Sequence, residues 1–208
     1  MRTVTARALE DWLENGRILE RDARGPKVVA LESGPENGLF LKIFHTRRHP
    51  LLARLQPAAK RFARNAECLE KLGIPAPEVV DSLWIGADAT GEEEYVSACL
   101  YRPLPGITLE NLFRQDPGKL EALLPDLARF IRQVHQKRIY FRSLHVGNIL
   151  SLPGGGFGLI DVLDLKHCLL PLGRWRIRRN FQHLSRHLAR RGLEDFPVSA
   201  LYRLYRLG

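Results

Sequence analysis

The sequence has few cysteines and no long apolar run, and both absences limit what the protein can be. Its three cysteines, Cys68, Cys99 and Cys168, are far apart, form no CxxC pair and have no histidine at a metal-ligand interval. This pattern favours free thiols in a reducing cytoplasm. No stretch approaches the length of a membrane span, and acidic residues interrupt the N-terminal segment where a signal peptide would be apolar. We therefore expect a cytoplasmic protein, at most peripheral to a membrane.

Acidic residues are also scarce relative to basic ones. The chain has 23 Asp and Glu against 32 Lys and Arg, which gives a formal charge of +9. Such a charge predicts attraction to an anionic partner: nucleic acid, a phosphorylated glycolipid, a membrane surface or a nucleotide. Charge alone does not choose among them. With 208 residues, of which 45% are hydrophobic, the chain can bury one substantial core, and we expect one bilobed domain.

The first half of the chain has mainly the pattern of β-strands. Glycine- and proline-containing turns separate the first strands, which predicts two successive hairpins and an antiparallel sheet. Apolar periodicity predicts two helices in this half. The expected elements are a helix over 4–15, strands near 18–20, 27–31 and 39–44, a helix over 57–72, and strands over 78–86 and 94–101, the last two separated by a polar turn at 89–93.

The second half is predicted to be mainly helical. A broad apolar stripe marks its longest helix. The expected elements are helices over 108–114 and 119–138, a polar loop over 141–150, a glycine-rich turn at 154–156, a strand over 158–162 and a basic helix over about 174–191. The change of pattern near residue 102 predicts an N-lobe over 1–102 and a C-lobe over 103–208.

Two short segments carry the residues best suited to chemistry. Asn148 and Asp161 each adjoin apolar strand residues that would hold them rigidly, and Mg²⁺ prefers oxygen donors of this kind while sharing its shell with nucleotide phosphates. Lys42 alternates out of an otherwise apolar strand, where a kinase needs a cation for those phosphates. Taken singly, each has an ordinary structural explanation, as a loop or turn cap or a solvated lysine. Their order along the chain is that of a kinase.

The same segments resemble a known family. LeuHisValGlyAsnIleLeu at 144–150 and LeuIleAspVal at 159–162 are similar to the LeuHisxxAsnIleLeu and LeuIleAspPhe signatures of the lipopolysaccharide kinases. These are the WaaP-like Kdo and heptose kinases of Gram-negative bacteria, with the small toluene tolerance proteins grouped beside them. The resemblance extends from about Gly38 to the basic C-terminal helix. It implies an α+β, bilobed protein-kinase-like fold, with an antiparallel β-sheet N-lobe and a small, mainly helical C-lobe.

The resemblance also implies roles for particular residues. Lys42 would contact the phosphates of ATP, and Asn148 and Asp161 would hold Mg²⁺. The segment 100–102, which includes Tyr101, would be the hinge that meets adenine, and Gly25 in the first hairpin is the candidate for a loop above the phosphates. This arrangement requires Lys42 and Asp161 to converge on one cleft between the lobes.

Two positions depart from the family pattern. The catalytic aspartate expected five residues before Asn148 is Ser143, whose hydroxyl cannot accept a proton as a carboxylate does near neutral pH. His145 is the residue that would contact the transferring phosphate instead, although a structural hydrogen bond explains it equally well; Asp164 is a further candidate to approach the acceptor. The helix position expected to hold an acid that pairs with Lys42 is Phe62. Glu67 or Glu70 would substitute in a shifted register.

The basic segment 166–191 contains no acidic residue, and its arginines suit phosphate recognition. Such a helix could simply be solvated, or it could meet the phosphorylated lipopolysaccharide core or the anionic inner membrane. The leading hypothesis is an ATP-dependent phosphotransferase of lipopolysaccharide-core sugar hydroxyls at the cytoplasmic face of the inner membrane. The alternative is a pseudokinase that binds nucleotide and regulates envelope biogenesis. A nucleic-acid-binding protein ranks last, because no specific nucleic-acid signature is present.

Overall fold

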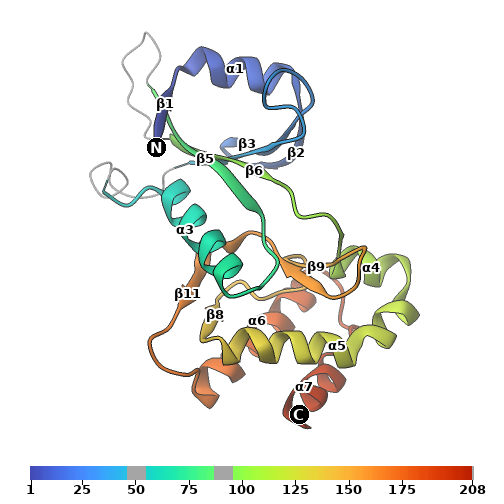
Figure 1. Cartoon of the computed structure of the whole chain (residues 1–208). Helices are drawn as coiled ribbons and strands as arrows, with labels where there is room; N and C mark the ends of the chain where they lie inside the picture. The colour runs from blue at the N-terminus through green and yellow to red at the C-terminus, as the bar shows by residue number, and fades with distance from the viewer. Residues whose placement is uncertain (46–54, 87–95, 208) are drawn as a thin grey trace. The chain divides into compact units, whose positions relative to one another are not determined.

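The computed structural model describes residues 1–45, 55–86 and 96–207. By its internal contacts the chain divides into two units (Figure 1). The first unit comprises Met1–Glu67 and Pro77–Pro103, and the second comprises Cys68–Ala76 and Leu104–Gly208. The segment 68–76, expected in the N-lobe, thus clusters with the second unit.

A six-stranded sheet forms the first unit. Its strands are β1 (Arg2–Val4), β2 (Gly16–Asp22), β3 (Gly25–Leu31), β4 (Phe40–Phe44), β5 (Glu78–Ile85) and β6 (Val96–Arg102). They lie in the order β1-β5-β6-β4-β3-β2. Every neighbouring pair is antiparallel except β1 and β5, which are parallel. The two predicted hairpins, β2–β3 and β3–β4, are therefore present.

Helix α1 (Ala6–Glu14) packs on one face of this sheet. The predicted helix was to begin at Val4, and that boundary is wrong. Thr5 caps the helix by accepting a hydrogen bond from the backbone N–H of Ala8 (3.2 Å), so the chain before it is extended. Val4 instead pairs with Ile85 in β1 and is buried. Figure 1 shows α1 next to the sheet.

Helix α3 (Ala58–Lys71) begins in the first unit, on the other face of β6. The backbone N–H of Ala59 donates to Ser97 Oγ (3.3 Å), and the Cys99 thiol donates to the carbonyl of Ala59 (3.3 Å). Burial raises the pKa of Cys99 to about 12. This thiol therefore stays protonated and serves packing, as expected for a free cysteine.

Helices dominate the second unit. They are α4 (Leu109–Gln115), α5 (Pro117–Gln136), α6 (Arg174–Arg190) and α7 (Val198–Leu207). The short strands β7 (Ile107–Thr108), β9 (Ile149–Ser151) and β10 (Phe157–Leu159) form one small sheet, and β8 (Ile139–Phe141) pairs with β11 (Leu165–His167) in another; a 3-10 turn, η1 (Val162–Asp164), precedes β11. The sequence predicted none of β7, β8, β11 and α7, and it assigned the start of β9 to the polar loop over 141–150. The strand predicted over 158–162 is too long, because β10 ends at Leu159 and η1 begins at Val162.

The predicted fold class, an α+β chain with a sheet-rich first half and a helical second half, is confirmed. The predicted polar turn at 89–93 and the start of the strand expected at 94 lie outside the described residues. Within the residues that the structure describes, no helix combines the length and the apolar character needed to cross a membrane.

Close packing in the second unit requires glycine at position 158. The backbone N–H of Leu159 donates to the carbonyl of Pro75 (2.9 Å), which brings β10 against the segment after α3. A Cβ at residue 158 would clash with Leu104 Cδ2 and would lie 3.0 Å from the Pro75 carbonyl oxygen. Backbone atoms at that distance cannot move aside without shifting the strand.

Gly158→Ala should therefore lower the free energy of unfolding by about 1–3 kcal/mol, as overpacking does in a filled core. Urea unfolding measures the change. Gly154→Ala is the matched control, because a Cβ there meets nothing within 4 Å, and it should change stability by less than about 0.5 kcal/mol. Equal stabilities of the two variants would contradict this packing.

Candidate active site

The β9–β10 hairpin brings Asn148 and Asp161 to the same end of one element. Ile149 of β9 pairs with Leu159 of β10, and the backbone N–H of Ile160 donates to the Asn148 carbonyl (2.9 Å) just beyond that pair. Asn148 and Asp161 thus adjoin the last rung of the ladder on opposite strands. The two proposed metal ligands are neighbours because of strand register.

The side chain of Asn148 is held in one orientation. It is buried, and its Nδ2 donates to the backbone carbonyl of Ser143 (3.2 Å). Oδ1 is then the atom of this amide that is suited to bind a cation. The same hydrogen bond ties Asn148 to the position where the family pattern has its catalytic aspartate.

Asp161 has an unusual backbone conformation. Its φ of 52° and ψ of 49° lie in the left-handed region, which Asp enters more readily than most residues. It precedes η1 but makes no side-chain capping hydrogen bond there, so helix capping does not explain the carboxylate. A strained backbone at an acidic residue is typical of functional sites.

This donor set fits a magnesium–nucleotide complex. Mg²⁺ is usually bound by one or two protein oxygens, with phosphate and water completing its shell. Asn148 supplies an amide oxygen and Asp161 a carboxylate at the same hairpin end. Among the described residues, no group of three or more His, Cys, Asp or Glu side chains could hold a metal ion. A metal at Asn148 and Asp161 would therefore need ligands from phosphate and water.

The loop 143–148 is fastened to helix α4. The backbone N–H of Glu110, in the first turn of α4, donates to the carbonyl of Val146 (3.1 Å). A Cβ on Gly147 would lie 3.3 Å from both Glu110 Oε2 and His145 Nδ1. Glycine at this position therefore lets the loop lie directly against the Glu110 carboxylate.

Glu110 is a buried carboxylate with cationic partners from two helices. It accepts from Arg191, whose Nη2 lies 2.7 Å from Oε1, and from Arg114 at 3.3 Å, and its Oε2 lies 3.5 Å from His187 Nε2. Burial alone would raise the pKa of Glu110, but the hydrogen bonds and charge of Arg191, with help from Arg114 and His187, outweigh burial and lower it. Glu110 is thus ionised beside the loop.

His145 stacks on His187, with ring centroids 3.9 Å apart and planes within 6°. Burial, followed by the charge of His187, lowers the pKa of His145 to about 4, against the opposite effect of Asp161 and Glu110. The ring is therefore neutral at physiological pH. A neutral ring can offer one N–H to a phosphate oxygen, but an imidazole with this pKa is a weak proton acceptor at neutral pH.

A second network, built on the buried Asn180 and His135, holds the start of the loop. Asn180 of α6 donates from Nδ2 to the carbonyl of Phe141 (2.8 Å), and its Oδ1 lies 3.1 Å from His135 Nε2. Because Oδ1 can only accept, His135 must carry its proton on Nε2, and its Nδ1 accepts from the Tyr205 hydroxyl (2.9 Å). Helices α5, α6 and α7 thereby meet at the residue that precedes the loop.

Lys42 lies in the first unit, on β4. It pairs with Val28 and Cys99 in the sheet and is buried, on the face toward α3. Its Nζ lies 5.7 Å from the centroid of the Phe62 ring, within the range of a cation–π contact. The helix position predicted to face Lys42 therefore does so, and it carries an aromatic ring. A pairing of Lys42 with Glu67 or Glu70 stays a prediction.

The other two residues expected to bind nucleotide also lie in the first unit. Gly25 opens β3 at the tip of the β2–β3 hairpin with φ of 124°, which requires glycine, and a Cβ there would meet nothing within 4 Å. Tyr101 lies in β6, with its ring against Phe40 and Phe62. The convergence of this group with Asn148 and Asp161, which lie in the second unit, stays a prediction.

The fold is that of a protein-kinase-like phosphotransferase. A family profile described as APH, phosphotransferase enzyme family, matches residues 17–142, which is more than half of the chain. The chain belongs to this family. The match ends at the residue before Ser143, so it does not cover the proposed metal ligands.

The fold is also similar to that of a solved structure described as WaaP in complex with acyl carrier protein. The TM-score is 0.53 and the sequence identity 16%, and the match covers 95% of this chain and 92% of that one. The predicted resemblance to WaaP-like lipopolysaccharide kinases is confirmed at the level of the fold. Similar folds occur in 1719 chains of solved structures, so the fold does not choose the substrate. No curated protein matches the sequence.

The sequence alone did not identify Glu110, His187 or Asn180. Each is a polar residue on a helix whose exposed face is also polar, and no motif surrounds it. Only Asn180 could have been found from its place in the sequence pattern, because it falls on the apolar face of α6 with Phe181 and Leu184. A polar residue among core positions indicates a buried hydrogen-bonded network.

The buried network makes stability depend on pH. Burial lowers the pKa of His135 to about 4 from an ordinary 6.5. Between these two values the unfolded chain binds a proton that the folded chain does not, so acid favours unfolding, whereas above 6.5 neither state binds it. His135→Gln should therefore flatten the decline in unfolding free energy from pH 6.5 to 4, by at most about 1.4 kcal/mol per pH unit.

Urea unfolding across this pH range measures the slope. Exposed His167→Gln is the control and should leave the slope unchanged. A slope that is identical in the wild type and in His135→Gln would contradict a neutral, buried His135.

Proposed function

We propose that this protein is an ATP-dependent, Mg²⁺-dependent phosphotransferase that acts on a sugar hydroxyl of the lipopolysaccharide core, or of a similar phosphorylated glycolipid, at the cytoplasmic face of the inner membrane. The observation that carries the proposal is the pair of oxygen donors, Asn148 and Asp161, at one end of the β9–β10 hairpin. Membership of a phosphotransferase family supports nucleotide and metal use in general.

In this proposal each residue has a limited task. Lys42 and the Gly25 hairpin tip bind phosphates, and the segment with Tyr101 meets the adenine. Asn148 and Asp161 hold Mg²⁺, which when bound neutralises charge on the phosphates. The neutral ring of His145 donates an N–H to a phosphate oxygen. Phosphoryl transfer depends mainly on positioning and electrostatics, so a site of this kind can act slowly without a strong base.

A pseudokinase that binds nucleotide and regulates envelope biogenesis is the second candidate. Three observations favour it. Ser143 stands where the base is expected, Phe62 occupies the helix position where an acid is expected, and the depressed pKa of His145 makes that residue a poor replacement base. Asp164, the other carboxylate considered, is exposed on η1.

Calorimetric titration with ATP and Mg²⁺ tests the shared part of both hypotheses. Asp161→Ala should weaken binding by roughly a hundredfold or more, because even outer partners of a metal ligand contribute 10–100-fold. Asp164→Ala removes a carboxylate three residues away on the same turn and should bind as the wild type does. Equal affinities for all three proteins would remove Asp161 from the metal site.

Turnover in the same samples, with isolated lipopolysaccharide core as acceptor, separates the two hypotheses. Phosphate transferred by the wild type but not by Asp161→Ala supports the enzyme. Tight binding of nucleotide with no transfer supports the pseudokinase.

A further inference from the structure

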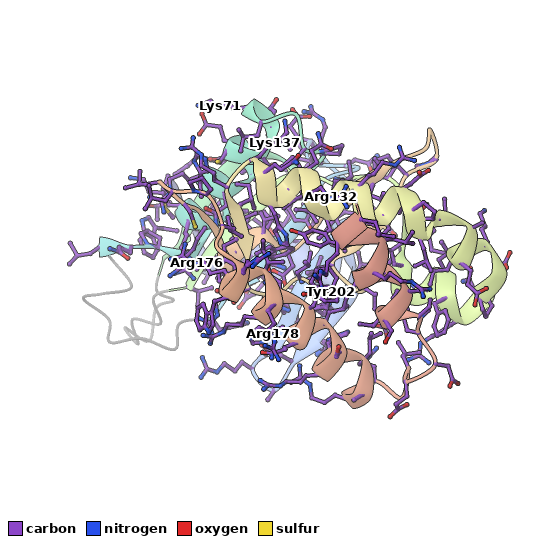
Figure 2. All side chains as sticks on the ribbon, turned by 90° about the horizontal axis from the view of Figure 1, so that it is seen from below. Lys71, Arg132, Lys137, Arg176, Arg178 and Tyr202 are labelled. Atoms are coloured by element: carbon purple, nitrogen blue, oxygen red, sulfur yellow. The ribbon has the colours of Figure 1, made fainter. Side chains whose placement is uncertain are left out.

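The outer face of helix α6 carries basic and aromatic side chains that have no role in the proposed active site. Its inner face is buried through Asn180, Phe181, Leu184 and Leu188. The outward residues form a stripe with the spacing of one helical face, and they line a groove of about 330 Å³. We call this set the α6 stripe: Trp175, Arg178, Arg179, Gln182, His183 and Arg186. Figure 2 shows Arg178 on this helix.

The α6 stripe is strongly positive. From residue 165 to residue 193 the sequence contains no Asp or Glu. Within the described part of the chain, no carboxylate forms an ion pair with Arg178, Arg179 or Arg186. Burial lowers the pKa of His183, and the charges of Arg179 and Arg186 on the same helix lower it further.

Large apolar side chains are exposed at the N-terminal end of the same helix. The segment just before α6 carries Leu169 and Leu170, exposed by 92% and 75%, and Trp175 in the first turn is exposed by 67%. Single exposed apolar residues are normal, but three within seven positions need an explanation. The Arg179 guanidinium lies 5.1 Å from the Trp175 ring, which joins the apolar end to the charged stripe.

We propose that the α6 stripe, with Leu169 and Leu170, docks this protein on an anionic lipid bilayer. Arginines attract the headgroups, while leucine and tryptophan side chains enter the boundary between headgroups and acyl chains, where tryptophan is favoured. A soluble phosphate compound would satisfy the arginines alone and leave the apolar residues in water. The stripe runs along about 16 Å of helix.

Docking on a bilayer would bring the protein to a lipid-linked substrate, and this purpose rests on the proposed function. The binding itself needs no nucleotide. Docking variants should therefore keep the Mg²⁺–ATP affinity of the wild type, so a failure of docking and a failure of nucleotide binding are separate results.

Sedimentation of the full chain with vesicles tests the charge. Wild type should bind vesicles of equal parts phosphatidylglycerol and phosphatidylcholine, bind less at high salt, and not bind phosphatidylcholine alone. Arg178→Gln, Arg179→Gln and Arg186→Gln together should weaken binding roughly a hundredfold, because each basic residue near an anionic surface contributes about fivefold. The control removes the same charge from exposed residues elsewhere in the second unit: Lys119→Gln, Arg203→Gln and Arg206→Gln. This control variant should lose much less of its affinity for the anionic vesicles than the test variant does.

Apolar variants test insertion. Leu169→Ser with Trp175→Ser should weaken vesicle binding by roughly tenfold or more, since both side chains lose their burial in lipid. Leu207→Ser changes another leucine, 78% exposed, on α7 and should bind as the wild type does.

Three results would overturn the proposal. One is absence of wild-type binding to anionic vesicles. Another is an equal loss in the test and control variants. The third is binding of a protein partner such as acyl carrier protein through the α6 stripe without any binding to vesicles.

Discussion

One backbone hydrogen bond, from the N–H of Ile160 to the carbonyl of Asn148, fixes the relation on which the proposed chemistry depends. It closes the β9–β10 hairpin at the rung beyond Ile149 and Leu159, and so brings residues 148 and 161 to the same hairpin end although 13 positions separate them in the sequence. A slip of one residue would turn either side chain to the opposite face. The close packing at Gly158 opposes such a slip.

The rest of the second unit holds that hairpin end in place. Glu110 secures the loop through its backbone and lies against Gly147, while Asn180 holds the carbonyl of Phe141 before the loop begins. Both supports are buried polar groups with satisfied partners, which rigidify a structure when complete. Helix α6 contributes Asn180 from its inner face and arginines from its outer face. One helix can therefore both support the proposed active site and present a surface for an anionic partner.

Sequence patterns predicted the antiparallel strands of the first unit with their two hairpins, and the long helices, because hydrophobic periodicity and turn residues are local signals. They missed β8 and β11, each only three residues long, where pairing across the chain decides the conformation. Val4 was assigned to a helix because its apolar spacing fits one, whereas the Thr5 cap and the parallel partner β5 make it a strand residue. Glu110 and His187 could not be found from sequence, because their importance comes from three helix and loop segments that meet only in the fold.

In the proposed phosphotransferase, Asn148 and Asp161 together form the metal site. Crystals grown with Mn²⁺ and a non-hydrolysable ATP analogue test it directly, because manganese gives an anomalous signal that locates the ion. We expect a manganese peak in contact with Asn148 Oδ1 and the Asp161 carboxylate, with the analogue's phosphates completing the metal's shell. Nucleotide bound with its metal elsewhere, or a metal that contacts neither side chain, would rule out this metal site.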